Sequence, residues 1–508
     1  MSRLVVRSRT RAQLDDAWPN AGLPATNTWL AMARCRRLAR LTVHAAGVLS
    51  IAAAFRTAPA SANPPLALTK GPYLTGLSES GVEVRFELNG AAPASLEVDC
   101  DGAGGSPPHK FDDEARTAMH VLRTSELAAA TRYGYVVRAD NRVVGRGSFT
   151  TAPRDDSGAQ LKFLVYGDDR TDPAAHAAVA RALASSPSDF LVNTGDMVED
   201  GGRAEDWQSF FDVEAQLLRD RPLFVAIGNH ELYDDRSGAN FARYFGFSAP
   251  SRGVEPYGTV RMSNVRFFFL NSFHDWSSGQ ERQWLERELS RSDAEPGLKW
   301  RIAVMHQGPW SSGPHGANGP FVAAHVPELL VSHGVDLVFA GHDHIYERGE
   351  GVGMKYVISG GGGAPLYRAS KTPNAQKLES TYHFVEVTTD RQAVHLLARR
   401  VDGSVLDECA FKKGENWQAA AGDEIAIRPE SSAGDALPRA ALGAEPKAPV
   451  AAAQKTTVVA ASPLPTTSSA RANCACELQG ARSPPAPALL LVAAAMAAAV
   501  ARRRGSPS

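Results

Sequence analysis

Five short apolar runs in the middle of the chain each end in side chains that can bind a metal ion or transfer a proton. Four of the runs reach these side chains through a glycine. The side chains are carboxylates, an amide and imidazoles: Asp168, Asp196, Asn229, His230, His306, His342 and His344. Such a mixture suits Zn, Fe or Mn better than Ca or Mg, which prefer oxygen ligands alone. Because the set exceeds what one tetrahedral ion needs, it predicts two metal ions.

Each of these residues has an ordinary explanation when it is taken alone. An aspartate can cap a helix, an asparagine can form a turn, and a histidine can be a hydrogen-bonded core residue. For any single position the ordinary explanation is favoured. Five strand ends that deliver such groups in succession are difficult to explain by packing alone.

The elements that would position these groups are strands alternating with helices. The expected strands are 161–166, 190–192, 223–227, 301–305 and 336–340, and helical spacing covers 173–185, 204–218, 279–289 and 321–333. This alternation predicts an α/β layered domain, in which ligands bind at the carboxyl ends of the strands. Further apolar runs predict closing, antiparallel strands at 354–358, 382–387 and 393–398.

The region before this domain has a different pattern. From residue 66 to 153 apolar residues alternate with polar ones in short runs, and turn residues such as Asn89-Gly90 separate the runs. This pattern predicts an all-β sandwich, and the region resembles a fibronectin type III domain. It contains no cluster of ionisable residues, so we expect it to serve in packing or display.

The order of the blocks identifies a family resemblance. The series is Gly167-Asp168, Gly195-Asp196, Gly228-Asn229-His230-Glu231, His306 and Gly341-His342-Asp343-His344. It resembles the calcineurin-like metallophosphoesterase superfamily, and together with the preceding sandwich it is similar to the purple acid phosphatase branch. The resemblance covers residues 66–412 and implies a four-layer α/β (α+β) sandwich in residues 160–412.

The resemblance also implies a role for each side chain. Asp196 would bridge two metal ions. Asp168 and His344 would bind the first ion. The second ion would be bound by Asn229, His306 and His342. His230 would contact the phosphate and protonate the leaving group.

This assignment implies an acid phosphatase-like phosphoric ester hydrolase. Two cations roughly 3.5–4 Å apart can clamp a phosphoryl group and generate a metal-bound hydroxide that attacks it. No Ser or Cys nucleophile motif is apparent. We therefore expect hydrolysis of phosphomonoesters. The alternatives are a phosphodiesterase of the same superfamily and a non-catalytic surface binding protein with a decayed metallophosphatase domain.

Two positions depart from the family pattern near the first metal. Arg170 stands where many superfamily members have a histidine, and Glu199 stands where purple acid phosphatases have a tyrosine. Glu199, His176 or a water could complete this site, although an ordinary polar position on a helix is favoured for His176. Arg170 could clamp phosphate with its planar fork or pair with a neighbouring aspartate. His315 and, more weakly, Arg348 are further candidates for contact with the substrate.

The chain is too long for one ordinary domain, and its N-terminus indicates export. Its net charge of −1 gives no reason to expect nucleic acid as a partner. Within residues 1–62, Arg34, Arg36, Arg37 and Arg40 precede an apolar run at 41–55 and then Ala60-Ser61-Ala62. This order is typical of a secretory signal peptide, for which Met32 would be the true start.

The C-terminus predicts retention at the cell surface. Residues 413–473 read as a disordered linker rich in Ala, Pro, Ser and Thr. Residues 474–508 contain Cys474-Ala475-Cys476, an apolar run and Arg502-Arg503-Arg504, and they resemble the myxobacterial C-terminal surface-sorting tail. The resemblance implies a sorting protease and a membrane as partners; an ordinary membrane anchor is the alternative. Oligomeric state is not indicated.

Overall fold

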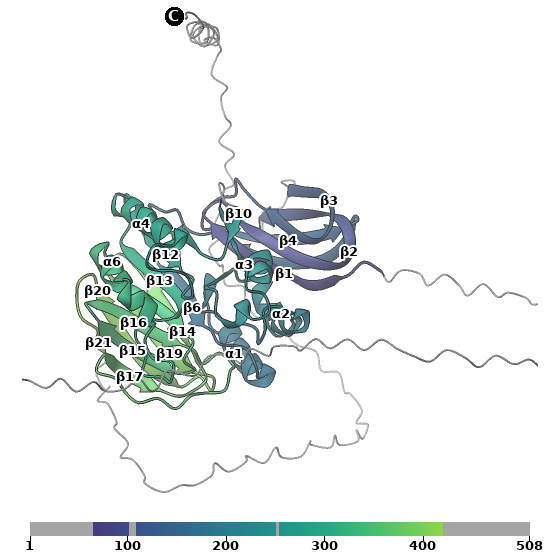
Figure 1. Ribbon diagram of the computed structural model, residues 1–508. Helices are drawn as coiled ribbons and strands as arrows, with labels where there is room; N and C mark the ends of the chain where they lie inside the picture. Colours follow the sequence, from purple (N-terminus) through teal and green to yellow (C-terminus); the bar gives the residue numbers. More distant parts are fainter. Residues whose placement is uncertain (1–64, 101–107, 250–252, 420–508) are drawn as a thin grey trace, which may run out of the picture. The chain divides into compact units, whose positions relative to one another are not determined.

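The computed structural model describes residues 65–100, 108–249 and 253–419 (Figure 1). The expected signal peptide, most of the linker and the sorting tail lie outside these residues. Within the described ranges, no helix has both the length and the apolar character that a membrane crossing requires.

In the described part of the chain, two mixed β-sheets form the centre of the larger region. The first sheet has the order β21-β20-β19-β18-β6-β7-β8, formed by Gln418–Ala419, Val405–Lys412, Ala393–Arg400, His383–Thr389, Leu161–Tyr166, Phe190–Asn193 and Leu223–Val225. The second has the order β11-β12-β13-β14-β16-β15-β17, formed by Gly258–Met262, Val265–Phe269, Trp300–Gln307, Leu337–Gly341, Met354–Ser359, Tyr346–Gly351 and Ala375–Glu379. A short hairpin pairs β9 (Phe247–Ala249) with β10 (Gly253–Glu255).

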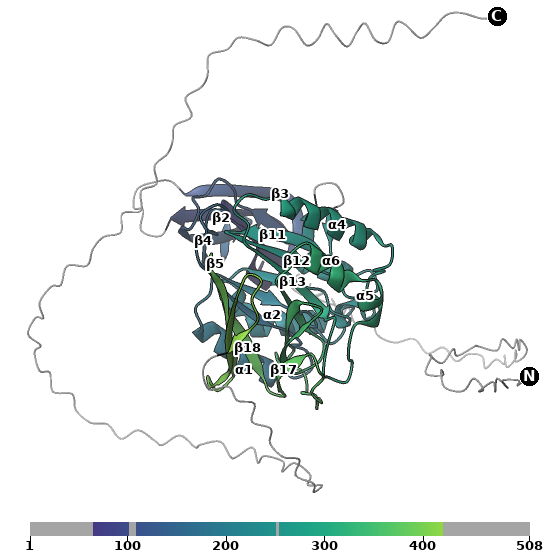
Figure 2. The same cartoon turned by 90° about the vertical axis from the view of Figure 1, so that its left-hand side faces the viewer.

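Helices cover the outer faces of both sheets. Those packed on the first sheet are α1 (Pro173–Ser185), α2 (Ala204–Leu218) and α3 (Ala239–Phe245). Those packed on the second are α4 (Gln280–Asp293), α5 (Gly319–Ala323) and α6 (Val326–Ser332). Figures 1 and 2 show α4 and α6 beside β12 and β13. The layers are helix, sheet, sheet, helix, and the predicted α/β sandwich is confirmed.

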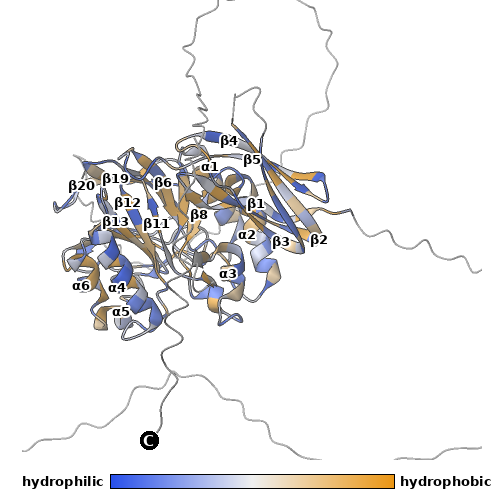
Figure 3. Cartoon of the chain, turned by 90° about the horizontal axis from the view of Figure 1, so that it is seen from above, coloured by the Kyte–Doolittle hydropathy of each residue, from blue (hydrophilic) through white to orange (hydrophobic). Residues whose placement is uncertain are grey.

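An aromatic core holds the two sheets together. Phe163 of β6 stacks on Phe190 of β7 with ring centroids 5.1 Å apart. Phe267 of β12 meets both rings edge-on, at 5.3 and 5.7 Å from their centroids. Strands buried on both faces carry continuous apolar runs. Figure 3 shows this as hydrophobic colour around β6 and β8, with hydrophilic residues along α4.

Helix α1 begins and ends at the predicted residues. Its N-cap is Asp172, whose side chain accepts hydrogen bonds from the amides of Ala174 and Ala175, and Pro173 occupies the first turn. Both features stabilise a helix start.

One prediction about the second sheet and its helices is wrong, and another is confirmed only in part. The single helix expected at 321–333 is two short helices, because His325 between them has a left-handed backbone (φ 54°) and Pro327 occupies the first turn of the second. Strand β16, expected to be antiparallel, pairs antiparallel with β15 but parallel with β14. The β15–β16 hairpin places β16 between its partner β15 and β14, so β16 takes the direction of β14.

The preceding region is all-β, as predicted. Its sheet contains β1 (Leu68–Ser78), β2 (Gly81–Cys100), β3 (His109–Arg123), β4 (Arg132–Ala139) and β5 (Arg142–Thr150). Strand β2 is continuous through the expected break at Asn89-Gly90. It pairs with β1 in its first half and with β4 in its second, and its register with β3 shifts between Glu87 and Ala94. The sheet thus bends around its own core.

Strand β1 also contributes to the core beneath α2 and α3. The Tyr73 ring lies 4.8 Å from the Phe211 ring and 5.6 Å from the Phe245 ring, and its hydroxyl donates to the carbonyl of Tyr244 at 3.0 Å. Arg85 donates to the same carbonyl at 2.9 Å. The all-β region therefore completes a hydrophobic cluster of the α/β region.

Candidate active site

The strand ends deliver the predicted side chains to one place. Asp168 follows β6, Asp196 follows β7, and Asn229 follows β8 and precedes a short 3-10 helix at His230–Leu232. These three strands belong to the first sheet. The other two strands belong to the second sheet: His306 lies within β13, and His342 and His344 follow β14. The site thus lies where the carboxyl ends of both sets of parallel strands meet.

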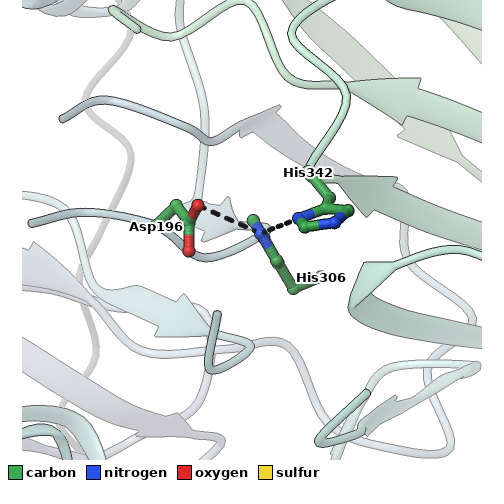
Figure 4. Close-up of side chains that lie close together, drawn as sticks. All are labelled: Asp196, His306 and His342. Carbon is green, nitrogen blue, oxygen red and sulfur yellow. Dashed lines mark hydrogen bonds and ion pairs between the residues drawn. The ribbon is translucent and has the colours of Figure 1, made fainter. Parts of the chain in front are cut away.

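Asp196, His306 and His342 form the centre of the site (Figure 4). The His306 Nε2 lies 3.2 Å from the Asp196 Oδ2 and 3.1 Å from the His342 Nδ1. Figure 4 shows the three side chains pointing toward one another. They come from three different strand ends, so the fold alone brings them together.

Asp168 and His344 adjoin this centre. The Asp168 Oδ1 lies 3.9 Å from the His306 Nε2 and 3.6 Å from the His344 Nε2. The backbone amide of His342 donates to both Asp168 oxygens at 3.0 Å. Asp168, His306 and His344 are almost completely buried.

Backbone carbonyls orient two of the imidazoles. The Nδ1 of His306 donates to the carbonyl of Thr194 at 2.9 Å, and the Nδ1 of His344 donates to the carbonyl of Pro365 at 2.6 Å. In the neutral rings, Nε2 then carries a lone pair that faces the centre. This is the tautomer and orientation that a metal-binding histidine requires.

Asn229 adds an orphaned acceptor. Asn229 lies between Gly228 and His230. The backbone amide of His230 donates to the Asp196 Oδ1 at 3.1 Å, which holds this segment close to Asp196. The side-chain Nδ2 of Asn229 donates to the Tyr233 hydroxyl at 3.1 Å, but its buried Oδ1 has no hydrogen-bond partner among the described residues. Buried acceptors without donors are rare, and a cation would satisfy this one. The donor set around Asp196 therefore fits a metal ion.

The electrostatics of the centre also favour a cation. Burial alone would lower the pKa of His306, but Asp196 and Asp168 raise it overall, to about 9. Burial, with a contribution from His306, lowers the pKa of His342 to about 2. The pKa of His344 is lowered to about 4, chiefly by burial. The imidazoles of His342 and His344 are thus neutral at physiological pH, the state in which a histidine can bind a metal ion, and the nearby carboxylates attract positive charge.

Three of the candidate ligands have strained backbones. Asp168, Asp196 and His342 have φ values of 61°, 57° and 71°. Side chains other than glycine rarely adopt this region, and residues held there cluster at functional sites. Close approach also requires a neighbouring glycine, because a Cβ on Gly341 would lie 2.3 Å from the Asp168 Oδ2. The chain thus turns sharply at each strand end and directs the side chain inward.

The catalytic candidate His230 lies beside the centre. Its Nδ1 donates to the carbonyl of Glu199 at 2.6 Å, and its Nε2 lies 3.8 Å from the Asp196 Oδ2. The side chain is mostly buried. His315 is exposed, and its ring centroid lies 4.2 Å from that of His342. Both imidazoles can therefore reach a substrate bound over Asp196 and His342.

Arg170 lies within the site as an ion-pair partner. Its Nε donates to the Asp196 Oδ2 at 3.2 Å, and its Nη1 donates to the Glu199 Oε2 at 3.2 Å. The Thr171 hydroxyl also donates to Glu199. Of the two roles considered for Arg170, the ion pair with a neighbouring aspartate is the one present.

Two weaker candidates lie elsewhere. The His176 Nε2 lies 2.8 Å from Glu214 Oε1 in a separate buried cluster that includes Asp169, so His176 does not complete the first metal site. Arg348 is buried and donates to Asp407 at 2.6 Å, which removes it as a phosphate contact. The partners of His176 and Arg348 lie far away in the sequence, so the spacing of residues along the chain could not predict these contacts.

Two acidic residues for which no role was predicted support the site. The Glu231 carboxylate accepts hydrogen bonds from the amides of Gly228 and Asp196. The Asp343 carboxylate accepts from the Ser311 hydroxyl and the amide of His315. Both acids belong to the blocks that carry the ligands, and this adjacency was the only signal available.

Comparison with known proteins agrees with this geometry. Residues 161–346 match the calcineurin-like phosphoesterase family. The chain is 30% identical over 213 residues to the probable purple acid phosphatase 20 of Arabidopsis thaliana, covering 40% of this chain and 48% of that protein. It is 26% identical over 346 residues to purple acid phosphatase 21 of the same plant, covering 61% of this chain and 75% of that protein.

Solved structures share the fold. The purple acid phosphatase PPD1 from yellow lupin (Lupinus luteus) seeds superimposes with a TM-score of 0.60 at 17% identity, covering 68% of this chain and 74% of that chain. PhoD gives a TM-score of 0.55 at 11% identity, covering 70% of this chain and 92% of that chain. The chain therefore contains a calcineurin-like metallophosphoesterase domain with purple acid phosphatases among its homologues.

Proposed function

We propose that this chain is a metal-dependent phosphomonoesterase of the acid phosphatase type. The observation that carries the proposal is the convergence of Asp196, His306 and His342 within hydrogen-bonding distance of one another. Carboxylate and imidazole ligands at that distance suit Zn, Fe or Mn, and the family implies such ions. Asn229 would complete this ligand set, while Asp168 and His344 form the adjoining set.

The chain's own residues would bind and orient the phosphoryl group. A metal ion, when bound, supplies a Lewis acid that polarises the phosphoryl group and activates water. The exposed His315 can donate a hydrogen bond to a phosphoryl oxygen, and the Arg170 guanidinium provides positive charge beside it.

His230 would transfer a proton to the leaving group. Its Nδ1–H is fixed by the carbonyl of Glu199, so its Nε2 faces the centre. A proton carried on Nε2 can pass to the oxygen of the departing alcohol. The ring centroid of Tyr233 lies 4.4 Å from that of His230 and restricts its rotation.

The charge around the site favours monoesters over diesters. A monoester dianion carries more negative charge than a diester, and Arg170 provides a fixed positive charge beside the centre. A phosphodiesterase remains the alternative within this fold. A non-catalytic binding protein is less well supported, since the candidate ligands and His230 lie close together.

We also propose export and retention at the cell surface. The basic and apolar segments before Ala60-Ser61-Ala62 and the Cys-containing tail at 474–508 support this location. Protease treatment of intact cells expressing the full chain tests it. Loss of the phosphoesterase region without cell lysis is expected, whereas complete protection would place the protein inside the cell.

The activity test uses two esters and one pair of variants. The full chain should hydrolyse p-nitrophenyl phosphate with a kcat/KM at least about tenfold above that for bis(p-nitrophenyl) phosphate. Asp196→Asn should abolish both turnover and metal content. Asp212→Asn, at an exposed position of α2, is the matched control and should change neither. A preference for the diester would identify a phosphodiesterase, and no turnover of either ester would contradict an enzyme.

A further inference from the structure

The Arg170 guanidinium occupies the position that the family pattern assigns to the first metal ion. Its Nε lies 3.2 Å from the Asp196 Oδ2, and its Nη2 lies 3.4 Å from the His344 Nε2. The third side chain of that set, Asp168, faces the same point, with its Oδ1 3.6 Å from the His344 Nε2. Arg170 thus contacts two of the three side chains expected to bind the first ion.

The contact with His344 excludes a metal ion at the same atom. Because the Nδ1 of His344 donates to the carbonyl of Pro365, its neutral ring has one lone pair, on Nε2. That lone pair accepts the hydrogen bond from Arg170. An imidazole nitrogen cannot bind a metal ion and accept a hydrogen bond with the same lone pair. One cation or the other therefore takes this position.

The remaining ligand set lacks such a donor. Asn229 Oδ1 is buried without a partner among the described residues, and the His306 Nε2 faces the Asp196 Oδ2 and the His342 Nδ1. Among the described residues, the side-chain hydrogen bonds and ion pairs of His306, His342 and Asn229 involve no arginine or lysine. The two sets thus differ: the Arg170 guanidinium contacts the first, and the second keeps a buried acceptor, Asn229 Oδ1, without a donor.

The two departures from the family pattern are bonded to each other. The Arg170 Nη1 donates to the Glu199 Oε2 at 3.2 Å, and the Thr171 hydroxyl donates to the same oxygen. The Arg170 side chain is only 12% exposed. Glu199 and Thr171 hold the guanidinium in place, so its position does not depend on Asp196 alone. The replacement is therefore a coordinated one, with its own anchoring partners.

We propose that Arg170 replaces the first metal ion, so that the chain binds one metal ion per molecule. This inference rests on the proposed function and specifies its cofactor. The ion would be held by Asp196, Asn229, His306 and His342. The guanidinium would supply the second positive charge beside the phosphoryl group. A centre of this kind needs no second ion to neutralise Asp168 and Asp196.

Metal stoichiometry tests the proposal without relying on turnover. Metal is first removed from the full chain with a chelator. Binding of added Mn²⁺ is then measured by isothermal titration calorimetry, and the metal content is measured after desalting. We expect one ion per chain. Bound Mn²⁺ should give the electron paramagnetic resonance spectrum of an isolated ion, without the signature of an exchange-coupled pair. Two tightly bound ions, or an exchange-coupled spectrum, would overturn the proposal.

Substitution of Arg170 gives the converse result. Arg170→His should raise the stoichiometry twofold, to two ions, because it removes the guanidinium and adds a ligand. Arg181→His, at an exposed position of α1, is the matched control and should leave one ion. Arg170→Gln removes the charge without adding a ligand, and it serves if the histidine variant does not fold. If neither variant gains a second ion, Arg170 is not the excluding group.

The outcomes also separate this proposal from the proposed function. No bound metal and no ester hydrolysis in the wild-type chain would contradict both. Two bound ions with hydrolysis would contradict only the replacement by Arg170. One bound ion with hydrolysis, and a second ion in Arg170→His, would support both.

Discussion

The Glu231 carboxylate accepts a hydrogen bond from the backbone amide of Asp196 at 3.0 Å. It also accepts from the amides of Gly228 at 2.7 Å and Met197 at 2.8 Å. One buried carboxylate thus joins the loop after β7 to the loop after β8. Since Asp196 lies in the first loop and Asn229 in the second, Glu231 fixes the distance between these two candidate ligands.

Glu231→Gln should weaken both the fold and metal binding. The side-chain NH₂ of glutamine would face backbone N–H groups that need an acceptor. The hydrogen bonds that these amides donate to the Glu231 carboxylate would be lost or weakened. We expect unfolding to require about 2–3 kcal/mol less. Chemical denaturation and Mn²⁺ titration measure the two effects. Glu205→Gln, at an exposed position of α2, is the control. An unchanged Mn²⁺ affinity would show that Glu231 does not position the ligands.

His230→Asn should impair poor leaving groups more than good ones. Without a proton donor, an alkoxide must leave unprotonated, which is slow because it is a strong base. The p-nitrophenolate ion is a weak base and leaves readily without a proton. We expect kcat for methyl phosphate to fall about 10²- to 10⁴-fold and kcat for p-nitrophenyl phosphate to fall far less. His274→Asn, which is exposed, should affect neither. Equal losses with both substrates would give His230 a binding role instead.

Removal of metal should destabilise the chain by an amount that grows with the logarithm of its affinity for the metal. A ligand that binds only the folded state at 100 times its Kd contributes about 2.7 kcal/mol. Thermal unfolding with and without chelator should therefore differ by several degrees. The Asp196→Asn variant provides the comparison, because it should show no such shift. An equal shift in both proteins would place the bound metal elsewhere.

His383 should make stability depend on pH below neutrality. This histidine is buried, and burial lowers its pKa from 6.5 to about 4. As the pH falls below 6.5, the unfolded chain binds a proton that the folded chain does not, so folding loses about 3 kcal/mol by pH 4. His383→Asn, which keeps a donor for the Thr381 carbonyl, should flatten this slope in chelator-treated protein. His395→Asn, exposed on β19, should not.

Tyr73 should couple the all-β region to the stability of the α/β region. Tyr73→Ala removes a buried ring between Phe211 and Phe245 and should cost about 3–5 kcal/mol of unfolding free energy. Tyr73→Phe removes only the hydrogen bond to Tyr244 and should cost about 1 kcal/mol. Denaturation followed by tryptophan fluorescence measures both. A small effect of the alanine variant would mean that the two regions unfold independently.

The sequence predicted features that depend on neighbouring residues. The strand ends at Asp168 and Asp196 were recognisable because an apolar run, a glycine and a ligand are adjacent in the chain. The start of α1 was equally local, with Asp172 and Pro173 side by side. Contacts between distant residues were not predictable: Glu214 binds His176, and Asp407 binds Arg348. The local sequence Asn89-Gly90 predicts a break in strand β2. The strand is nevertheless continuous, because it pairs with β1 before this point and with β4 after it.

The left-handed backbones at Asp168, Asp196 and His342 bear on how this protein can evolve. Glycine adopts that conformation without strain, so a glycine at any of the three positions would relieve a backbone cost. The same change would remove a candidate ligand and, at Asp168 and Asp196, the acceptor of a backbone amide. The strain therefore cannot be relieved by substitution without loss of the site.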